Sequence, residues 1–229
     1  MRKTKIVVPV LPTTVAEVQE LNVEKYRKAD IIEWRADFLG DIESILQAAP
    51  FIFEKFKDFS LLFTVRTANE GGNISISKKD YVTLLKKVAK FDPDYIDIEY
   101  FSYRKALPQL LEFKEKIVLS YHNFFESPTD LTARMMKMQR EETGFVKVAI
   151  MAQRECDVLD LLQIIRDFTM EYGPKFIGIA MGELGKISRV AGGLTGSVWT
   201  FVALDKEEGS APGQLTLPQM LDVLDALEA

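Results

Sequence analysis

The chain has 229 residues, of which 47% are hydrophobic and 28% charged, and its 29 basic and 34 acidic residues give a net charge of −5. This size suits a globular protein with a large core, and a single cysteine, Cys156, excludes an internal disulfide and a cysteine-rich metal site. The acidic balance argues against broad nucleic-acid binding. With no signal peptide of normal length and no run that approaches a membrane span, we expect a cytoplasmic protein.

Eight short apolar runs recur along the chain. Most are too short and too apolar for exposed antiparallel strands, so we predict parallel strands covered by helices. The runs are residues 5–10, 31–35, 61–66, 95–99, 117–122, 146–150, 176–180 and 198–203.

Amphipathic stretches separate these runs. The predicted helices are residues 14–28, 41–58 with a break at Pro50, 81–90 after a capping sequence at Ser77, 102–114, 131–141, 157–172 and 216–227. Residues 182–196 are too rich in glycine for a long helix. The alternation predicts an α/β fold, a (β/α)₈ TIM barrel that forms a single domain over residues 1–229, with an open doubly wound sheet as the alternative. No linker or repeat marks a second domain.

Polar residues collect where the predicted strands end. In a parallel barrel these carboxyl ends face one mouth, where chemistry is built. Random surface charge would not accumulate at the same end of successive strands. The residues in question are Glu33, Arg35, Arg66, Glu70, Asp97, Glu99, His122, Lys147, Arg189, Ser210 and Gln214.

Two of these residues suggest covalent chemistry. Lys147 interrupts an apolar run, where burial disfavours its charged form and can leave a nucleophilic amine. His122, the only histidine, ends the preceding strand and could shuttle protons. Each also has a structural reading: a histidine at a strand end is often only a hydrogen-bonding group. The lysine could pair with Glu33, Asp97 or Glu99.

Other chemistries fit the sequence less well. Glu33 and Arg35 share one face of a strand and could form a structural ion pair. The sequence has a single histidine and no histidine–carboxylate pair at the close spacing that metal ligands usually show, which argues against a metal site. No P-loop, dinucleotide fingerprint or nucleophile elbow is present, and residues 192–196 are only a weak candidate for holding a phosphate.

Taken in order, seven segments resemble the type I 3-dehydroquinate dehydratase family. Any one of them is weak, but the ordered set spans nearly the whole chain and is specific. One departure is the end of the first strand, where Pro9 stands in a region that often carries a small polar residue in the family. The segments are EWRAD at 33–37, FTVRT at 63–67 with EGG at 70–72, DYIDIE at 94–99, SYHNF at 120–124, VKVA at 146–149, ISRVAG at 187–192 and SAPGQ at 210–214.

The resemblance implies a cofactor-free and metal-free dehydration of 3-dehydroquinate to 3-dehydroshikimate, carried out by a homodimeric barrel enzyme. Lys147 would form an imine with the ring ketone, His122 would move protons, and Glu70 would position His122 or Arg66. Arg189 would clamp the substrate carboxylate, since a guanidinium offers two parallel donors. Glu33 and Arg66 would bind ring hydroxyls, Arg35 would orient Glu33, and Ser210 and Gln214 would lie on a loop that closes over the substrate.

Two further functions stay open from the residues alone. A class I aldolase also uses a barrel lysine, although its usual sugar-phosphate recognition is poorly represented here. A non-catalytic module that binds a ring acid is the other alternative, and an intact Lys147 and His122 argue against it. Borohydride trapping on Lys147 distinguishes the three, because each predicts a different ligand dependence.

Overall fold

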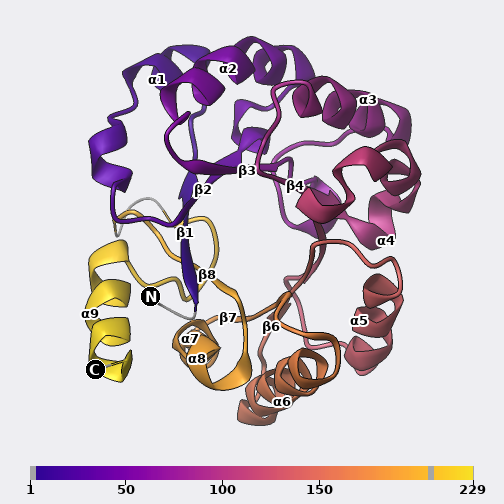
Figure 1. Cartoon of the computed structure of the whole chain (residues 1–229), viewed down its shortest axis with the longest axis vertical. Coiled ribbons are helices and arrows are strands. Elements are labelled where there is room, and N and C mark those ends of the chain that lie inside the picture. The colour runs from indigo at the N-terminus through magenta and orange to yellow at the C-terminus, as the bar shows by residue number, and fades with distance from the viewer. Residues whose placement is uncertain (1–3, 206–208, 229) are drawn as a thin grey trace.

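The computed structural model describes residues 4–205 and 209–228, and it contains one sheet of eight parallel strands. The strands surround the centre of the molecule and the helices form an outer ring (Figure 1). The predicted barrel is therefore confirmed. The strands are β1 (Lys5–Val10), β2 (Ile31–Arg35), β3 (Ser60–Thr64), β4 (Tyr95–Glu99), β5 (Ile117–Asn123), β6 (Phe145–Met151), β7 (Phe176–Met181) and β8 (Trp199–Phe201).

Closure of the barrel is weakest between β7 and β8. The strand order runs from β7 through β1 to β8, so these two strands form the two edges of the sheet. A backbone hydrogen bond from Val198 N–H to the Phe176 carbonyl (2.9 Å) joins the edges, and Ser197 Oγ accepts one from Gly178 N–H (3.2 Å). The ring of strands is thus nearly closed, and the side chains that point inward share one interior.

The helices follow the strands in the alternation expected of a barrel. Asp41 and Ser77 each cap the helix that follows, by accepting a backbone N–H from its first turn. None of the described helices is long and apolar enough to cross a lipid bilayer. The α-helices are α1 (Val15–Glu20), α2 (Ile42–Lys55), α3 (Lys78–Ala89), α4 (Tyr100–Tyr103), α5 (Leu131–Gln139), α6 (Glu155–Tyr172), α7 (Lys186–Val190), α8 (Gly192–Thr195) and α9 (Leu217–Glu228), and the 3₁₀ turns are η1 (Val23–Tyr26), η2 (Ala36–Leu39), η3 (Ala68–Glu70), η4 (Arg104–Gln109) and η5 (Leu111–Lys116).

Three predicted helices differ from the structure. The helix predicted over 14–28 ends at Glu20, because Asn22 caps a separate 3₁₀ turn with its side chain. The predicted break at Pro50 is wrong: α2 runs through it, since Pro50 lies on the exposed face while other residues of the helix pack into the core. Residues 102–114 form short turns around Pro108 instead of one helix.

Two apolar layers enclose the strands. The larger lies between the sheet and the helices, and the smaller fills the barrel interior. At the amino end of the barrel three rings pack together: Trp199 lies 4.5 Å from Phe145 and 4.7 Å from Tyr95, measured between ring centroids. Because side chains alternate along a strand, the polar residues nearer the carboxyl ends also point inward, above this aromatic floor.

Pro9 lies within β1, opposite Glu33 of β2. Proline cannot donate a ladder hydrogen bond, so a neighbour on its donor side would be left without a partner. On that side β8 pairs only as far as Val7 and its strand ends at Phe201. The early end of β8 therefore accommodates Pro9 where the family resemblance suggested a polar side chain.

Candidate active site

A small cavity opens at the carboxyl ends of the strands. Of the nine predicted site residues, eight line it, and the ninth, Glu70, lies directly behind His122. The barrel therefore brings together side chains from five strands, from α7 and from the loop that precedes α9. The lining residues are Glu33, Arg35, Arg66, His122, Phe124, Lys147, Ala149, Ile179, Met181, Arg189, Phe201, Ser210, Ala211 and Gln214.

Lys147 points into this cavity from β6 and is only 4% exposed. Its Nζ lies 3.8 Å from the centroid of the Phe201 ring and 3.8 Å from Glu33 Oε1. Burial lowers the pKa of the Lys147 amine, and the positive charges of Arg66 and Arg35 lower it further, against the opposite effect of Glu33 and Asp97. The amine is thus disposed to lose its proton while it faces the cavity.

The carboxylate of Glu33 is held by a neighbouring hydroxyl. Thr64 Oγ1 donates to Glu33 Oε1 at 2.9 Å. The expectation that Arg35 orients Glu33 is wrong, because the Arg35 guanidinium donates from Nε and Nη2 to the two oxygens of Asp37, each at 2.8 Å. Asp37 also accepts from the backbone N–H groups of Arg66 and Asn73, so it ties Arg35 to the segment that follows β3.

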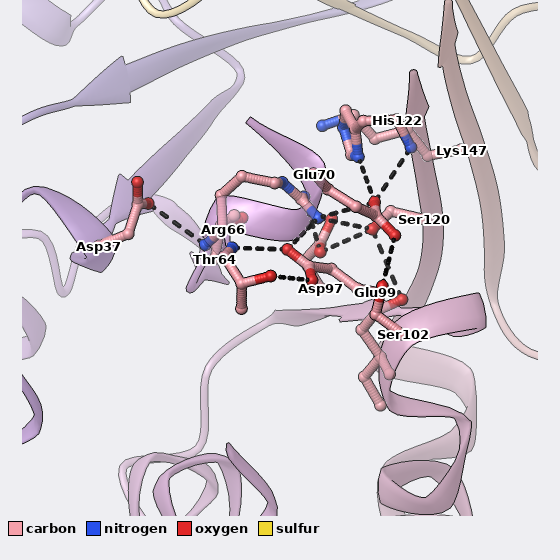
Figure 2. Close-up of polar contacts among 12 residues, drawn as sticks. Asp37, Thr64, Arg66, Glu70, Asp97, Glu99, Ser102, Ser120, His122 and Lys147 are labelled. Carbon is pink, nitrogen blue, oxygen red and sulfur yellow. Dashed lines mark hydrogen bonds and ion pairs between the residues drawn. The ribbon is translucent and has the colours of Figure 1, made fainter. Parts of the chain in front are cut away.

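His122 and Glu70 form a buried pair. Glu70 Oε2 accepts from the backbone N–H of His122 and lies 3.0 Å from its Nδ1 (Figure 2). Burial lowers the pKa of His122, and it raises the pKa of Glu70 to about 8. Nδ1 is occupied by Glu70, so Nε2 is the nitrogen left to act on a bound molecule.

Arg66 occupies the centre of a buried charge cluster below His122. It forms ion pairs with Asp97 (2.7 Å), Glu99 (3.1 Å) and Glu70 (3.6 Å), and its Nη1 donates to Ser120 Oγ at 3.1 Å (Figure 2). Two of the three carboxylates that could have held Lys147, Asp97 and Glu99, are thus engaged by Arg66. The shared contacts fix the guanidinium at the wall of the cavity.

Arg189 reaches the cavity from α7 and is 2% exposed. Its Nη1 donates to the carbonyl of Phe201 (3.1 Å) and its Nη2 to that of Pro212 (2.9 Å), whereas Nε has no hydrogen-bond partner among the described residues. Burial lowers its pKa to about 10. No carboxylate pairs with it in residues 4–205 and 209–228, so this buried cation suits an anionic ligand.

Ser210 and Gln214 hold one loop together at the rim. Gln214 Oε1 accepts from Ser210 N–H (2.7 Å), and Gln214 Nε2 donates to Ser210 Oγ (3.0 Å). The loop is anchored by Gly182 N–H, which donates to the Pro212 carbonyl (3.3 Å). It therefore forms one wall of the cavity.

Sequence reasoning missed four residues that shape the site. Thr64 and Ser120 were detectable, because each stands two residues before a predicted site residue on the same strand face, Arg66 and His122 respectively. Phe201 carried no such signal, since an apolar residue in an apolar strand is ordinary. Asp37 follows the end of β2, where the period-two rule no longer applies.

Comparison with known proteins gives a consistent result. The sequence profile of the family described as Type I 3-dehydroquinase matches residues 6–229. A 3-dehydroquinate dehydratase of Lactococcus lactis subsp. cremoris is 57% identical over 228 residues, which cover 100% of this chain and 98% of the relative. One from Streptococcus thermophilus is 49% identical, with 98% and 99% covered.

Solved structures agree with these relatives. A type I 3-dehydroquinate dehydratase from Clostridium difficile, with covalently modified comenic acid, superimposes with a TM-score of 0.86 at 32% identity and covers 99% of this chain and 93% of its own. The enzyme from Enterococcus faecalis gives a TM-score of 0.85 at 30% identity, with 99% and 95% covered.

Proposed function

Because this chain belongs to the type I 3-dehydroquinase family and is a 3-dehydroquinate dehydratase, a hydro-lyase of the shikimate pathway, we propose that Lys147 is the residue that carries the reaction. The observation that supports this role is a buried amine and a buried imidazole in one cavity, the imidazole backed by Glu70. The proposed reaction uses these two groups in turn.

Lys147 Nζ attacks the ketone carbon of 3-dehydroquinate, and loss of one water gives an iminium. The positive iminium withdraws electrons and acidifies the proton on the adjacent carbon. His122 removes that proton, and the resulting enamine expels the hydroxyl group at the next carbon, which leaves as water with a proton from His122. Hydrolysis of the conjugated iminium consumes one water and returns the amine with 3-dehydroshikimate. The net change is the loss of one water.

The charges around Lys147 suit both halves of this cycle. An amine must be free of its proton to attack, which burial favours. The iminium that follows is again a cation, and the Phe201 ring and Glu33 lie beside it. The same surroundings therefore support the free amine before the attack and the cation after it.

His122 and Glu70 supply the proton transfers in this scheme. His122 acts as a base in the form in which its Nδ1–H donates to the Glu70 carboxylate, because this form leaves Nε2 free to take the substrate proton. Glu70 then stabilises the charge that develops on the ring. Glu70 acts through His122, and it is held in turn by its contact with Arg66.

The remaining residues would bind the substrate. Arg189 would hold the ring carboxylate, because it is a buried cation without a carboxylate partner in the described part of the chain. Glu33 and Arg66 would contact ring hydroxyls, with Arg35 completing that wall. Ser210 and Gln214 would cover the substrate from the rim, where Gln214 already braces the loop.

The finer assignments follow from the family. We propose one catalytic domain that acts as a homodimer in the cytoplasm on a small molecule, without a nucleic-acid partner and without a cofactor. Analytical ultracentrifugation of the purified protein tests the dimer, and a single species at the monomer mass would contradict it.

The reaction itself is tested by the conjugated enone that forms from 3-dehydroquinate, followed by its ultraviolet absorbance with chelator present and no added metal. We expect the enone to appear at the same rate with and without chelator. A rate that collapses with chelator would contradict the metal-free route.

A further inference from the structure

The separation of Lys147 and Glu33 is unusual for a buried pair of opposite charges. Their closest atoms, Nζ and Oε1, are 3.8 Å apart. A direct bond between an ammonium and a carboxylate measures about 2.7–2.9 Å. At the observed separation the two groups attract each other, but no hydrogen bond is formed.

Thr64 explains why the gap stays open. Its hydroxyl donates at 2.9 Å to the same oxygen, Glu33 Oε1, that faces the amine. Thr64 is completely buried at the end of β3, and a β-branched side chain on a strand has few rotamers. The position of this hydroxyl is therefore fixed by the barrel.

We propose that Thr64 is a positioning residue, whose hydroxyl holds the Glu33 carboxylate too far from Lys147 to form a hydrogen-bonded ion pair. The proposal rests on the function of Lys147 proposed above. Without the hydroxyl, Glu33 closes on Nζ, the ammonium is stabilised, and less of the amine is free to attack at neutral pH. Thr64 also keeps Oε1 engaged, so that Oε2, which makes no hydrogen bond in the described residues, remains for the substrate.

Other charged groups act on the same amine and set the background for this effect. Arg35 and Arg66 favour the free amine, and Asp97 favours the ammonium. In the described part of the chain, the Thr64 hydroxyl donates only to Glu33 and forms no hydrogen bond with these other groups. The charged or titratable groups that share the cavity or act on Lys147 are Glu33, Arg35, Arg66, Asp97, His122 and Arg189.

Three variants test the role of the hydroxyl. Thr64→Val keeps the shape of the side chain and removes the donor, and Thr64→Ser keeps the donor. Thr200→Val is the matched control, because Thr200 is a buried threonine on β8 whose hydroxyl has no hydrogen-bond partner in the described residues. The measurements are kcat/KM against pH, and the fraction of enzyme trapped by borohydride after brief mixing with 3-dehydroquinate at each pH.

For Thr64→Val we expect the acid limb of both profiles to move up by about one pH unit, which lowers kcat/KM about tenfold below the midpoint. Raising the pH restores the variant, which a misfolded enzyme would not show. Thr64→Ser and Thr200→Val are expected to keep the parent profile. If the valine variant does not fold, Thr64→Ala replaces it with the same expectation.

Contrary outcomes are distinct. An unshifted Thr64→Val profile overturns the role of Thr64, as does an equal shift in Thr64→Ser or Thr200→Val. Lys147→Ala is measured in parallel: if it is inactive while Thr64→Val is unshifted, only this inference fails. If Lys147→Ala retains full activity, the proposed function of Lys147 fails as well.

Discussion

His122 and Glu70 are joined at two points, since a single oxygen of Glu70 accepts the backbone N–H of His122 and also faces its Nδ1, each at 3.0 Å. The backbone contact fixes where the carboxylate lies, and the ring contact then fixes how the imidazole is turned. The orientation of the proton-transferring group is thus built into the ends of β5 and the turn η3. Disturbing Glu70 should alter catalysis more than substrate binding.

Replacement of Glu70 by glutamine tests this expectation. Glutamine can still accept the backbone N–H, but it cannot stabilise a positive imidazole. We expect kcat to fall about tenfold to a hundredfold with KM little changed. Ser102→Ala is the control, because Ser102 contacts the other oxygen of Glu70 at a long 3.4 Å. A selective rise in KM would instead assign Glu70 to substrate binding.

Lys147→Ala should abolish turnover and the borohydride-trapped adduct, because no other amine lines the cavity in the described residues. Lys175→Ala is a matched control: burial also lowers the pKa of Lys175, but this lysine lies immediately before β7, away from the site. Intact-mass spectrometry after borohydride treatment with substrate reads the adduct. Trapping that persists in Lys147→Ala would place the imine elsewhere.

The lowered pKa of Lys147 also makes stability depend on pH. Between this lowered value and the ordinary value of 10.5, the unfolded chain binds a proton that the folded protein lacks. The free energy of unfolding therefore rises with pH through that window. Lys147→Met removes the group, so the stability of the parent minus that of the variant should increase from pH 7 to pH 10. Urea unfolding of both proteins at the two pH values measures it; a difference that stays constant or decreases would contradict the lowered pKa.

Arg189→Ala should weaken substrate binding. Loss of a charge-assisted contact to the carboxylate costs about 1.5–3 kcal/mol, which raises KM about tenfold to a hundredfold. Arg166→Ala, on the exposed face of α6, is the control and should leave KM unchanged. An unaltered KM in Arg189→Ala would move the carboxylate site to another cation of the cavity.

Gly71→Ala should lower both stability and activity. Gly71 has a φ of +80°, and a Cβ there would overlap the ring of Phe124, which lines the cavity. Gly40→Ala separates the two effects, because Gly40 has a φ of +81° but no atom within 4 Å of its Cβ position. We expect a loss of about 1 kcal/mol for Gly40→Ala with normal activity, and about 3 kcal/mol for Gly71→Ala with reduced activity. Thermal unfolding and kcat/KM measure them, and equal losses in the two variants would exclude a role for Phe124.

The barrel and most of its site residues were predictable because parallel strands place their carboxyl ends together. That rule alone predicted that Lys147 and His122 face the same cavity, although it could not give the distance between them. Partner choice was not predictable: Arg35 could have paired with Glu33 on its own strand, yet it pairs with Asp37 in the turn that follows. Local rules also failed at Pro50, where packing of the rest of α2 outweighs the missing hydrogen bond.

The three packed rings at the amino end of the barrel have a consequence for how substrate and water enter and leave the enzyme. Tyr95, Phe145 and Trp199 line the base with apolar ring faces and edges, at centroid separations of 4.5–5.4 Å. Because such rings offer water no hydrogen-bond partner, we expect the water expelled in each cycle to leave through the opening that admits the substrate. Substrate entry, product release and water exchange would then use the same opening, so a change that slows one of them is expected to slow the other two.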